Sequence, residues 1–165
     1  MIVRLIELAE HERLGELTVA AYHALPGGIT EDSYDAELRD VASRVLALDT
    51  EVLVAVDGAT VLGGVTYVAS SASPYYELDP DPDAASFRML AVDPARQGSG
   101  AGRALVAEVV ERSRAAGRRR ILIHSTPWMT GAHAMYDRFG FTRWPQLDWE
   151  PRPGIVLWGF ALELG

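Results

Sequence analysis

The stretch AVDPARQGSGAGRALVAEVV, from Ala91 to Val110, decides how this chain folds. An apolar run ends at a proline, and glycines follow at every second position from 98 to 102. Apolar residues with helical spacing begin directly afterwards. Such a strand–turn–helix segment can direct several backbone N–H groups toward one point, where the helix dipole favours negative charge. The stretch therefore predicts a phosphate-binding turn, with a glycine-rich turn that binds nothing as the alternative.

Two common phosphate-binding motifs do not fit these glycines. The dinucleotide pattern G-x-G-x-x-G requires glycine at 103 or 105, where the chain has Arg103 and Leu105. The nucleoside-triphosphate pattern requires Lys followed by Ser or Thr, and this turn contains no such pair. Arg96 and Arg103 flank the turn and can pair with phosphate oxygens. We therefore expect the pyrophosphate of a different cofactor.

Periodicity on both sides of the turn predicts alternating strands and helices. The order β-α-α-β-β-β-α-β-α-β-β predicts one α/β domain (α+β in some schemes) spanning residues 1–165. We expect a mixed sheet of about seven strands with helices on both faces. Asp57-Gly58 predicts a hairpin. LPGG at 25–28 separates the first two predicted helices, and Thr30 is the expected N-terminal cap of the second helix. The expected strands are 2–8, 51–56, 60–70, 86–92, 119–125, 141–149 and 154–164, and the expected helices are 10–24, 31–48, 102–117 and 130–140.

Composition limits the class of protein. Hydrophobic residues make up 48% of the 165 residues and charged residues 23%, as in globular domains. The formal charge of −8 disfavours nucleic acid as a partner. The chain has no cysteine and no histidine pair at i, i+4 spacing, so we expect no disulfide and no metal site. The N-terminus shows no signal-peptide cleavage site, and we expect a cytoplasmic protein with no membrane association.

Two motifs in this order resemble the GNAT superfamily of N-acetyltransferases. The turn matches the family's acyl-CoA-binding pattern R/Q-x-x-G-x-G/A with Gln97, Gly100 and Gly102. The segment AHAMYDRFGF at 132–141 is similar to the family's A-x-x-x-Y-x-x-x-G-F segment. The predicted order of elements also matches. The resemblance implies the GNAT fold, acetyl-CoA as co-substrate without a metal, and a small-molecule amine or peptide N-terminus as acceptor.

The resemblance also implies which residues hold the cofactor. The pantetheine arm would lie along the strand 86–92, in the opening toward the strand 120–125, with a backbone N–H of Leu90 or Ala91 polarising the thioester carbonyl. The residues implied for the cofactor are Leu90, Ala91, Val92, Arg96, Gln97, Gly98, Ser99, Gly100, Ala101, Gly102 and Arg103.

Two side chains are candidates for proton transfer. By resemblance, Tyr136 would protonate the departing thiolate, and the alternative is a packed aromatic residue with a structural hydroxyl. His124 stands 12 residues before it, where one family branch has a glutamate base. Strand alternation places Leu122 and His124 on one face of the sheet. A histidine can act as a base near neutral pH. The alternative for His124 is a half-buried histidine that is hydrogen-bonded to a neighbour. The base would then be the acidic loop 77–83 or an ordered water.

The acceptor side carries weaker signals. Tyr22, Tyr75, Tyr76 and Glu77 are candidates for contacting the acceptor, and the acidic loop favours a cationic one. His133 is expected to be exposed, and Met129 replaces an asparagine common in the family. Exposed tryptophans at 144, 149 and 158 would indicate a homodimer. Two rival functions are a non-catalytic acyl-CoA-binding sensor or interaction module and a small-molecule kinase that ATP with magnesium would stabilise.

Overall fold

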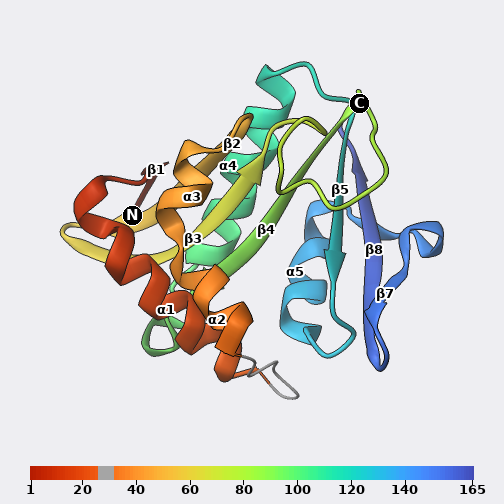
Figure 1. The fold of residues 1–165 in the computed structure, drawn as a ribbon. Helices are drawn as coiled ribbons and strands as arrows, with labels where there is room; N and C mark the ends of the chain where they lie inside the picture. Colours follow the sequence, from red (N-terminus) through yellow and green to blue (C-terminus); the bar gives the residue numbers. More distant parts are fainter. Residues whose placement is uncertain (26–31) are drawn as a thin grey trace.

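The chain is arranged around one mixed sheet with helices packed against it (Figure 1). The computed structural model describes residues 1–25 and 32–165. Within these residues the sheet has eight strands in the order β1-β2-β3-β4-β5-β8-β6, and β7 pairs with β8. The strands are β1 (Ile2–Leu5), β2 (Thr50–Asp57), β3 (Thr60–Val68), β4 (Ala84–Val92), β5 (Arg120–Ser125), β6 (Thr142–Arg143), β7 (Trp149–Arg152) and β8 (Ile155–Glu163). The helices are α1 (His11–His23), α2 (Asp32–Arg39), α3 (Val41–Leu46), α4 (Ala101–Ala115) and α5 (Thr130–Phe139), with 3-10 turns at Leu8–Glu10, Pro94–Arg96 and Pro145–Leu147.

Strand β2 shows why helices cover both faces of the sheet. Its residues Leu53 and Ala55 lie in the core that contains the apolar side chains of α4 and Tyr136 of α5. Val52 and Val54, which alternate with them, lie in a second core with apolar residues of α1 and α3. Because successive side chains of a strand point to opposite faces, both faces of β2 need a covering layer. The predicted mixed sheet with helices on both faces is confirmed.

Strands β4 and β5 are paired only where they begin. Their parallel register joins Ala84 to Arg120 and Ala85 to Ile121. Beyond these pairs the strands separate toward their C-terminal ends, as Figure 1 shows. Unpaired strand edges inside a sheet leave backbone N–H and C=O groups available for a ligand. The sheet therefore opens where the sequence predicts the cofactor.

Two local predictions between β1 and β4 have different outcomes. The Asp57-Gly58 hairpin is confirmed, because Asp57 pairs with Thr60 and Gly58 has a φ of +58°. The single helix predicted over 31–48 is wrong, since α2 and α3 are separated at Asp40. Its carboxylate accepts hydrogen bonds from the backbone N–H of Ser43 (3.2 Å) and from the Ser43 hydroxyl (2.6 Å), which starts a new helix. The expected cap Thr30 and residues 26–28 of the LPGG segment lie outside the described residues.

The strand predicted over 141–149 is also wrong. Within this segment only Thr142–Arg143 and the last residue, Trp149, pair with β8, and a 3-10 turn begins at Pro145 between them. Proline has no N–H to continue a ladder, so pairing stops there. Pairing resumes at Trp149, and β7 extends to Arg152, into the segment 150–154 that was expected to be a turn.

The tryptophans of this region do not form one exposed surface. Trp149 is 50% exposed, whereas Trp158 packs against the main core and Trp144 against a smaller apolar cluster. In the described part of the chain, no helix combines the length and apolarity needed to cross a membrane.

Candidate active site

The opening between β4 and β5 is a cleft of about 1020 Å³. Its walls come from β4 residues 86–92, the loop 97–103, the end of β5 at 124–126 and the face of α5. On the opposite side it reaches Tyr22 of α1, Glu37 of α2 and β7. Ligand-binding clefts usually enclose 300–1,000 Å³. This cleft therefore has room for a large cofactor together with a second reactant.

One end of the cleft is a backbone cradle at the start of α4. Gly98 and Gly100 have φ values of +82° and +85°, a left-handed conformation that side chains other than glycine rarely adopt. This conformation turns the exposed loop into the N-terminus of α4, which begins at Ala101, so the start of the helix borders the cleft. The Gln97 amide holds the loop by donating to the carbonyl of Val92 (3.3 Å).

The cradle brings together most of the residues expected there. Residues 97–103 and Leu90, Ala91 and Val92 all line the cleft. Arg96 is not among the cleft-lining residues of the described chain, whereas Arg138 of α5 is, although sequence reasoning did not single it out. Arg103 therefore provides a cationic group in the cradle itself, and Arg138 adds another to the cleft lining.

Strand β4 contains a bulge in the middle of the cleft. Arg88 pairs with Thr66 and Ala91 with Gly64, so Met89 and Leu90 together oppose the single residue Val65 of β3. Met89 has a φ of +54°, which is strained for a non-glycine residue. A bulge breaks the ladder and redirects backbone groups. Such strain commonly marks a functional site, and it occurs beside Leu90, where the resemblance placed the N–H that contacts the thioester.

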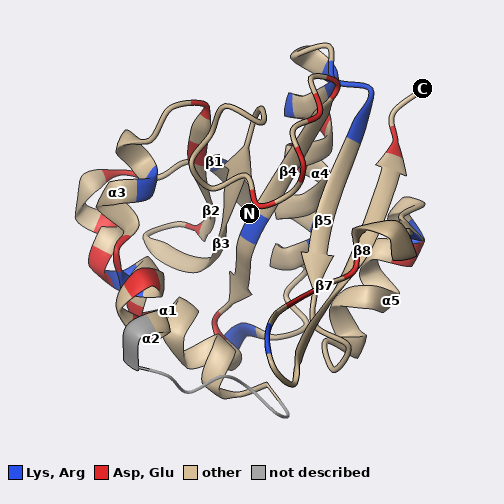
Figure 2. Ribbon diagram, turned by 45° about the vertical axis from the view of Figure 1, so that its right-hand side comes forward, with Lys and Arg blue, Asp and Glu red and all other residues tan. Residues whose placement is uncertain are grey.

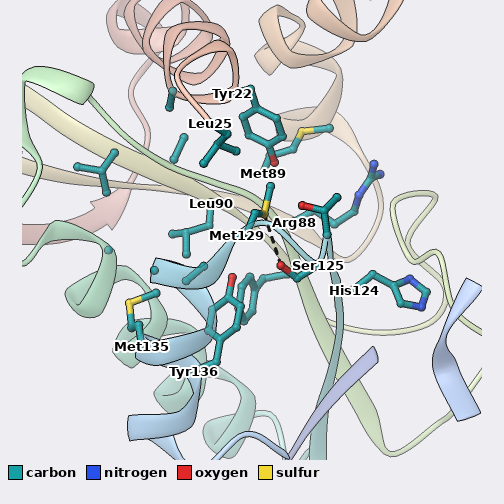
Figure 3. Close-up of a pocket in the computed structure, with 18 of the residues that line it drawn as sticks. Tyr22, Leu25, Arg88, Met89, Leu90, His124, Ser125, Met129, Met135 and Tyr136 are labelled. Atoms are coloured by element: carbon teal, nitrogen blue, oxygen red, sulfur yellow. Dashed lines mark hydrogen bonds between the residues drawn. The ribbon is translucent and has the colours of Figure 1, made fainter. Parts of the chain in front are cut away.

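Tyr136 lies across the cleft from this bulge. Its ring packs edge-on against Phe87 and Phe160 and is almost fully buried. Figure 3 shows its hydroxyl pointing into the cleft toward Leu90. Burial raises the pKa of the hydroxyl well above its usual value, so this group is a hydrogen-bond donor at physiological pH.

His124 points away from Tyr136, on the other face of β5 (Figure 3). Leu122 shares that face and packs with Leu147, as the strand alternation predicted. The Nε2 atom of His124 lies 2.6 Å from the carbonyl oxygen of Leu147. Because a carbonyl only accepts, Nε2 carries the proton and donates it. The other ring nitrogen, Nδ1, is buried without a hydrogen-bond partner.

His133 is half-buried, and the prediction that it is exposed is wrong. Its ring stacks on Trp158 (5.8 Å between centroids) and packs against Phe160 (4.9 Å). Its Nε2 atom lies 3.0 Å from the hydroxyl of Ser125, the last residue of β5. The Ser125 hydroxyl also lies 3.4 Å from the sulfur of Met129, an interaction drawn in Figure 3. Sequence reasoning identified neither side of this pair, because packing of α5 on β5 creates it.

The far end of the cleft is lined by aromatic and charged side chains. Tyr22 and Tyr34 pack together at 5.8 Å, and burial raises the pKa of both hydroxyls. Arg88 of β4 lies 2.9 Å from a carboxylate oxygen of Glu77 and 3.7 Å from one of Glu37. The sequence had singled out Tyr22 and Glu77 but neither Tyr34, Glu37 nor Arg88.

Tyr75 and Tyr76 were expected beside the acceptor, but the described residues that line the cleft do not include them. Tyr75 instead lies under the guanidinium of Arg88, 5.9 Å from it. Burial, with Asp81 and Asp79 nearby, raises the pKa of Tyr76 to about 12.

The fold is thus a mixed sheet that opens between two diverging strands, with a glycine-rich turn at a helix N-terminus and a buried tyrosine lining the opening. Residues 7–141 match the Acetyltransferase (GNAT) family. Because this match covers most of the sequence, the chain belongs to the GNAT family.

Solved structures agree on the fold. The structure of yncA from Salmonella typhimurium, solved with its cofactor acetyl-CoA, has a TM-score of 0.71 at 22% identity and covers 99% of this chain and 94% of that one. A GNAT-family acetyltransferase from Staphylococcus aureus Mu50 has a TM-score of 0.75 at 13% identity, covering 99% of both chains. A GCN5-related N-acetyltransferase from Kribbella flavida has a TM-score of 0.69 at 24% identity, with coverage of 99% and 97%.

A shorter match links the chain to mycothiol acetyltransferase of Streptosporangium roseum. The two sequences are 38% identical over 56 residues, which is 34% of this chain and 17% of that protein. The match therefore spans less than a fifth of that relative's length.

Proposed function

We propose that this protein transfers an acetyl group from acetyl-CoA to an amine by direct attack of the amine on the thioester. The cleft between β4 and β5 carries the proposal, because it connects the α4 N-terminus, the bulge at Met89 and the hydroxyl of Tyr136. These three features would serve the pyrophosphate, the thioester carbonyl and the thioester sulfur of the cofactor, respectively. An acyl-cysteine route is closed, since the chain has no cysteine.

The residues at the cradle fit a pyrophosphate. The left-handed loop at Gly98 and Gly100 supplies backbone N–H groups and the positive end of α4. Arg103 lies in the cradle, Arg138 adds to the cleft lining, and both can pair with phosphate oxygens. The unpaired edge of β4 from Leu90 to Val92 can bind the amides of the pantetheine arm as a neighbouring strand would.

Acetyl-CoA supplies an activated acyl thioester, and the chain supplies the groups that surround it. A backbone N–H released at the bulge, that of Leu90 or Ala91, would donate to the thioester oxygen as negative charge develops there. Tyr136 would donate its proton to the departing sulfur, since its raised pKa keeps the hydroxyl protonated until then. His124 remains a candidate base only through Nδ1, because Nε2 is bonded to Leu147.

The acceptor would enter from the side of Tyr22 and Tyr34. Two carboxylates, Glu37 and Glu77, lie beside the guanidinium of Arg88 there. Figure 2 shows both acidic and basic residues along α1, α2 and α3. These carboxylates and the formal charge of −8 on the chain favour a cationic amine, on a small molecule or a peptide N-terminus.

A CoA-release assay across a panel of amines, paired with thermal melts, tests this function. We expect acetyl-CoA to raise the melting temperature and at least one cationic amine to be acetylated. Stabilisation by acetyl-CoA without turnover of any amine would indicate a sensor or interaction module. Stabilisation by ATP with magnesium, and none by acetyl-CoA, would contradict the proposal.

A further inference from the structure

Ser125 and His133 form a hydrogen-bonded pair that leads from the cleft into the core. Ser125 lines the cleft at the end of β5 and is 5% exposed. His133 is absent from the lining of the described cleft and lies behind Ser125 on α5, with Nε2 3.0 Å from its hydroxyl. A serine hydroxyl has one hydrogen but two acceptor lone pairs. It can therefore receive a proton from a group in the cleft while it passes its own to His133.

The surroundings of His133 favour its neutral form. On α5 it faces Tyr136 at 6.5 Å, and on β8 it faces Trp158 and Phe160, which carry no charge. Arg143 of β6 lies over the Trp158 ring and is paired with Asp148. Burial lowers the pKa of His133, Arg143 lowers it further, and a hydrogen bond to the backbone of Thr126 opposes both. His133 is therefore ready to accept a proton near pH 7.

We propose that Ser125 and His133 together deprotonate the acceptor amine, an inference that rests on the acetyl transfer proposed above. One N–H bond of the substrate ammonium breaks, and its proton goes to Ser125 Oγ while the Ser125 hydroxyl proton goes to His133 Nε2. Ser125 is neutral before and after, and the positive charge moves from the substrate nitrogen to the imidazolium. His133 then releases the proton to solvent, and the neutral amine is the nucleophile.

The geometry favours this pair over His124. The nitrogen of His124 that could accept a proton is buried, and its ring points away from Tyr136. Ser125 instead lies on the same side of the cleft as Met129 and faces the space between Leu90 and Tyr136 (Figure 3). An amine in that space would contact Ser125 while it attacks a thioester carbonyl held at the bulge.

The pH dependence of kcat tests the proposal. For the wild type, kcat should rise with pH through a midpoint below that of a free imidazole and then level off. His133→Gln and Ser125→Ala should each lower kcat at pH 7 by about 10²-fold. In both variants kcat should keep rising toward the pKa of the amine itself. The KM for acetyl-CoA and the melting shift with acetyl-CoA should stay unchanged, which also reports that each variant is folded.

Three further variants sharpen the result. Ser125→Thr keeps a hydroxyl and should retain most of the activity. The double variant should be no slower than either single one, because the two residues act as a unit. His11→Gln, on α1 and far from the cleft, should match the wild type.

Two outcomes would overturn the pair. If the wild type is active and the pH profiles of kcat in Ser125→Ala and His133→Gln match it, the pair is not the base. If only His124→Gln loses the rise of kcat with pH, His124 is the base instead. Failure of the proposed function looks different, since the wild type itself would then acetylate no amine.

Discussion

Tyr136 is the residue whose chemistry depends most on its neighbours. Phe87, Phe141 and Phe160 surround its ring, and burial keeps its hydroxyl protonated. Tyr136→Phe removes the hydroxyl and keeps the packing. We expect kcat to fall about 10²-fold, since protonation of the departing sulfur is lost. The KM for acetyl-CoA should not change, and steady-state kinetics with a fixed amine would measure both.

Tyr67→Phe is the matched control for this prediction. Tyr67 is also buried, and its hydroxyl accepts a hydrogen bond from Ser113 (3.4 Å) in the core beneath α4. Its loss should change stability slightly and leave kcat as in the wild type. Equal kinetic losses in both variants would mean that Tyr136 acts only through packing.

Single residues differ in how visible they are in a sequence. Gly98 and Gly100 are recognisable because a left-handed loop before a helix needs glycine, so their spacing carries the information. Ser125 and His133 have no such signal, because only the packing of α5 against β5 brings them together. The strained Met89 also lacks a sequence signal, since a methionine in an apolar strand does not predict a positive φ.

At the scale of helices, Arg44 explains how a break between α2 and α3 is tolerated. It is almost completely buried and donates to the carbonyl oxygens of Glu37 (2.9 Å), Leu38 and Asp40. These carbonyls belong to the end of α2 and the break itself, where regular helical hydrogen bonding ends and Glu37 keeps one backbone donor, the N–H of Asp40 (3.2 Å). The arginine side chain therefore completes the end of one helix from within the next.

Arg44→Met should be costly because it removes the side-chain donor that these carbonyls share in the core. We expect the free energy of unfolding to fall by about 2–4 kcal/mol. Chemical denaturation would measure the change. Arg39→Met, at an exposed position of α2, should change stability by no more than about 0.5 kcal/mol. A stable Arg44→Met protein would show that water or other groups satisfy these carbonyls.

At the scale of strands, Asp148 ties the 3-10 turn after β6 to β8. It pairs with Arg143 through both oxygens (2.7 and 2.8 Å) and accepts from the Gly159 N–H (2.8 Å). The Arg143 hydrogen bond is the largest cause that lowers the pKa of Asp148, to about 2 from the usual 3.8. A carboxylate whose pKa is lower in the folded state than in the unfolded state stabilises the fold at pH values above its unfolded-state pKa. This stabilisation is lost as the pH falls through the folded-state pKa. Asp148→Asn should therefore melt at a lower temperature than the wild type at pH 7.

The pH dependence of this difference in melting temperature distinguishes loss of the negative charge of Asp148 from a change in side-chain geometry. The difference in melting temperature should shrink between about pH 4 and pH 2, where the wild-type carboxylate becomes protonated. Melts followed by circular dichroism at both ends of this range would measure it. A constant difference would mean that the amide fails for geometric reasons instead.

At the scale of the whole molecule, the sequence predicts the layers of helices and strands better than the positions where one element ends and the next begins. The β-rich run at 51–56 and the helical spacing at 102–117 predict a strand and a helix, and β2 and α4 confirm both. The errors lie at Asp40 and Pro145, where one residue redirects the backbone inside an otherwise periodic segment. Such positions depend on a local competition for hydrogen bonds that periodicity does not record.

The short junction between β4 and β5 makes a prediction for the whole molecule. Only two residue pairs join these strands, so beyond Ala85 and Ile121 the sheet is held by its covering helices. A cofactor bound along the β4 edge would complete the interrupted sheet. At a concentration of 100 times its Kd, acetyl-CoA should stabilise the fold by about 2.7 kcal/mol.

Hydrogen exchange would show where that stabilisation acts. We expect acetyl-CoA to slow exchange at residues 97–103 and also along β4 from Leu90 to Val92, because both the cradle and the strand edge would donate to the ligand. ATP with magnesium, which has phosphates but no pantetheine arm, is the matched control and should leave β4 unchanged. Protection confined to the cradle would mean that the ligand binds only through its phosphates, and the opening in the sheet would then need another explanation.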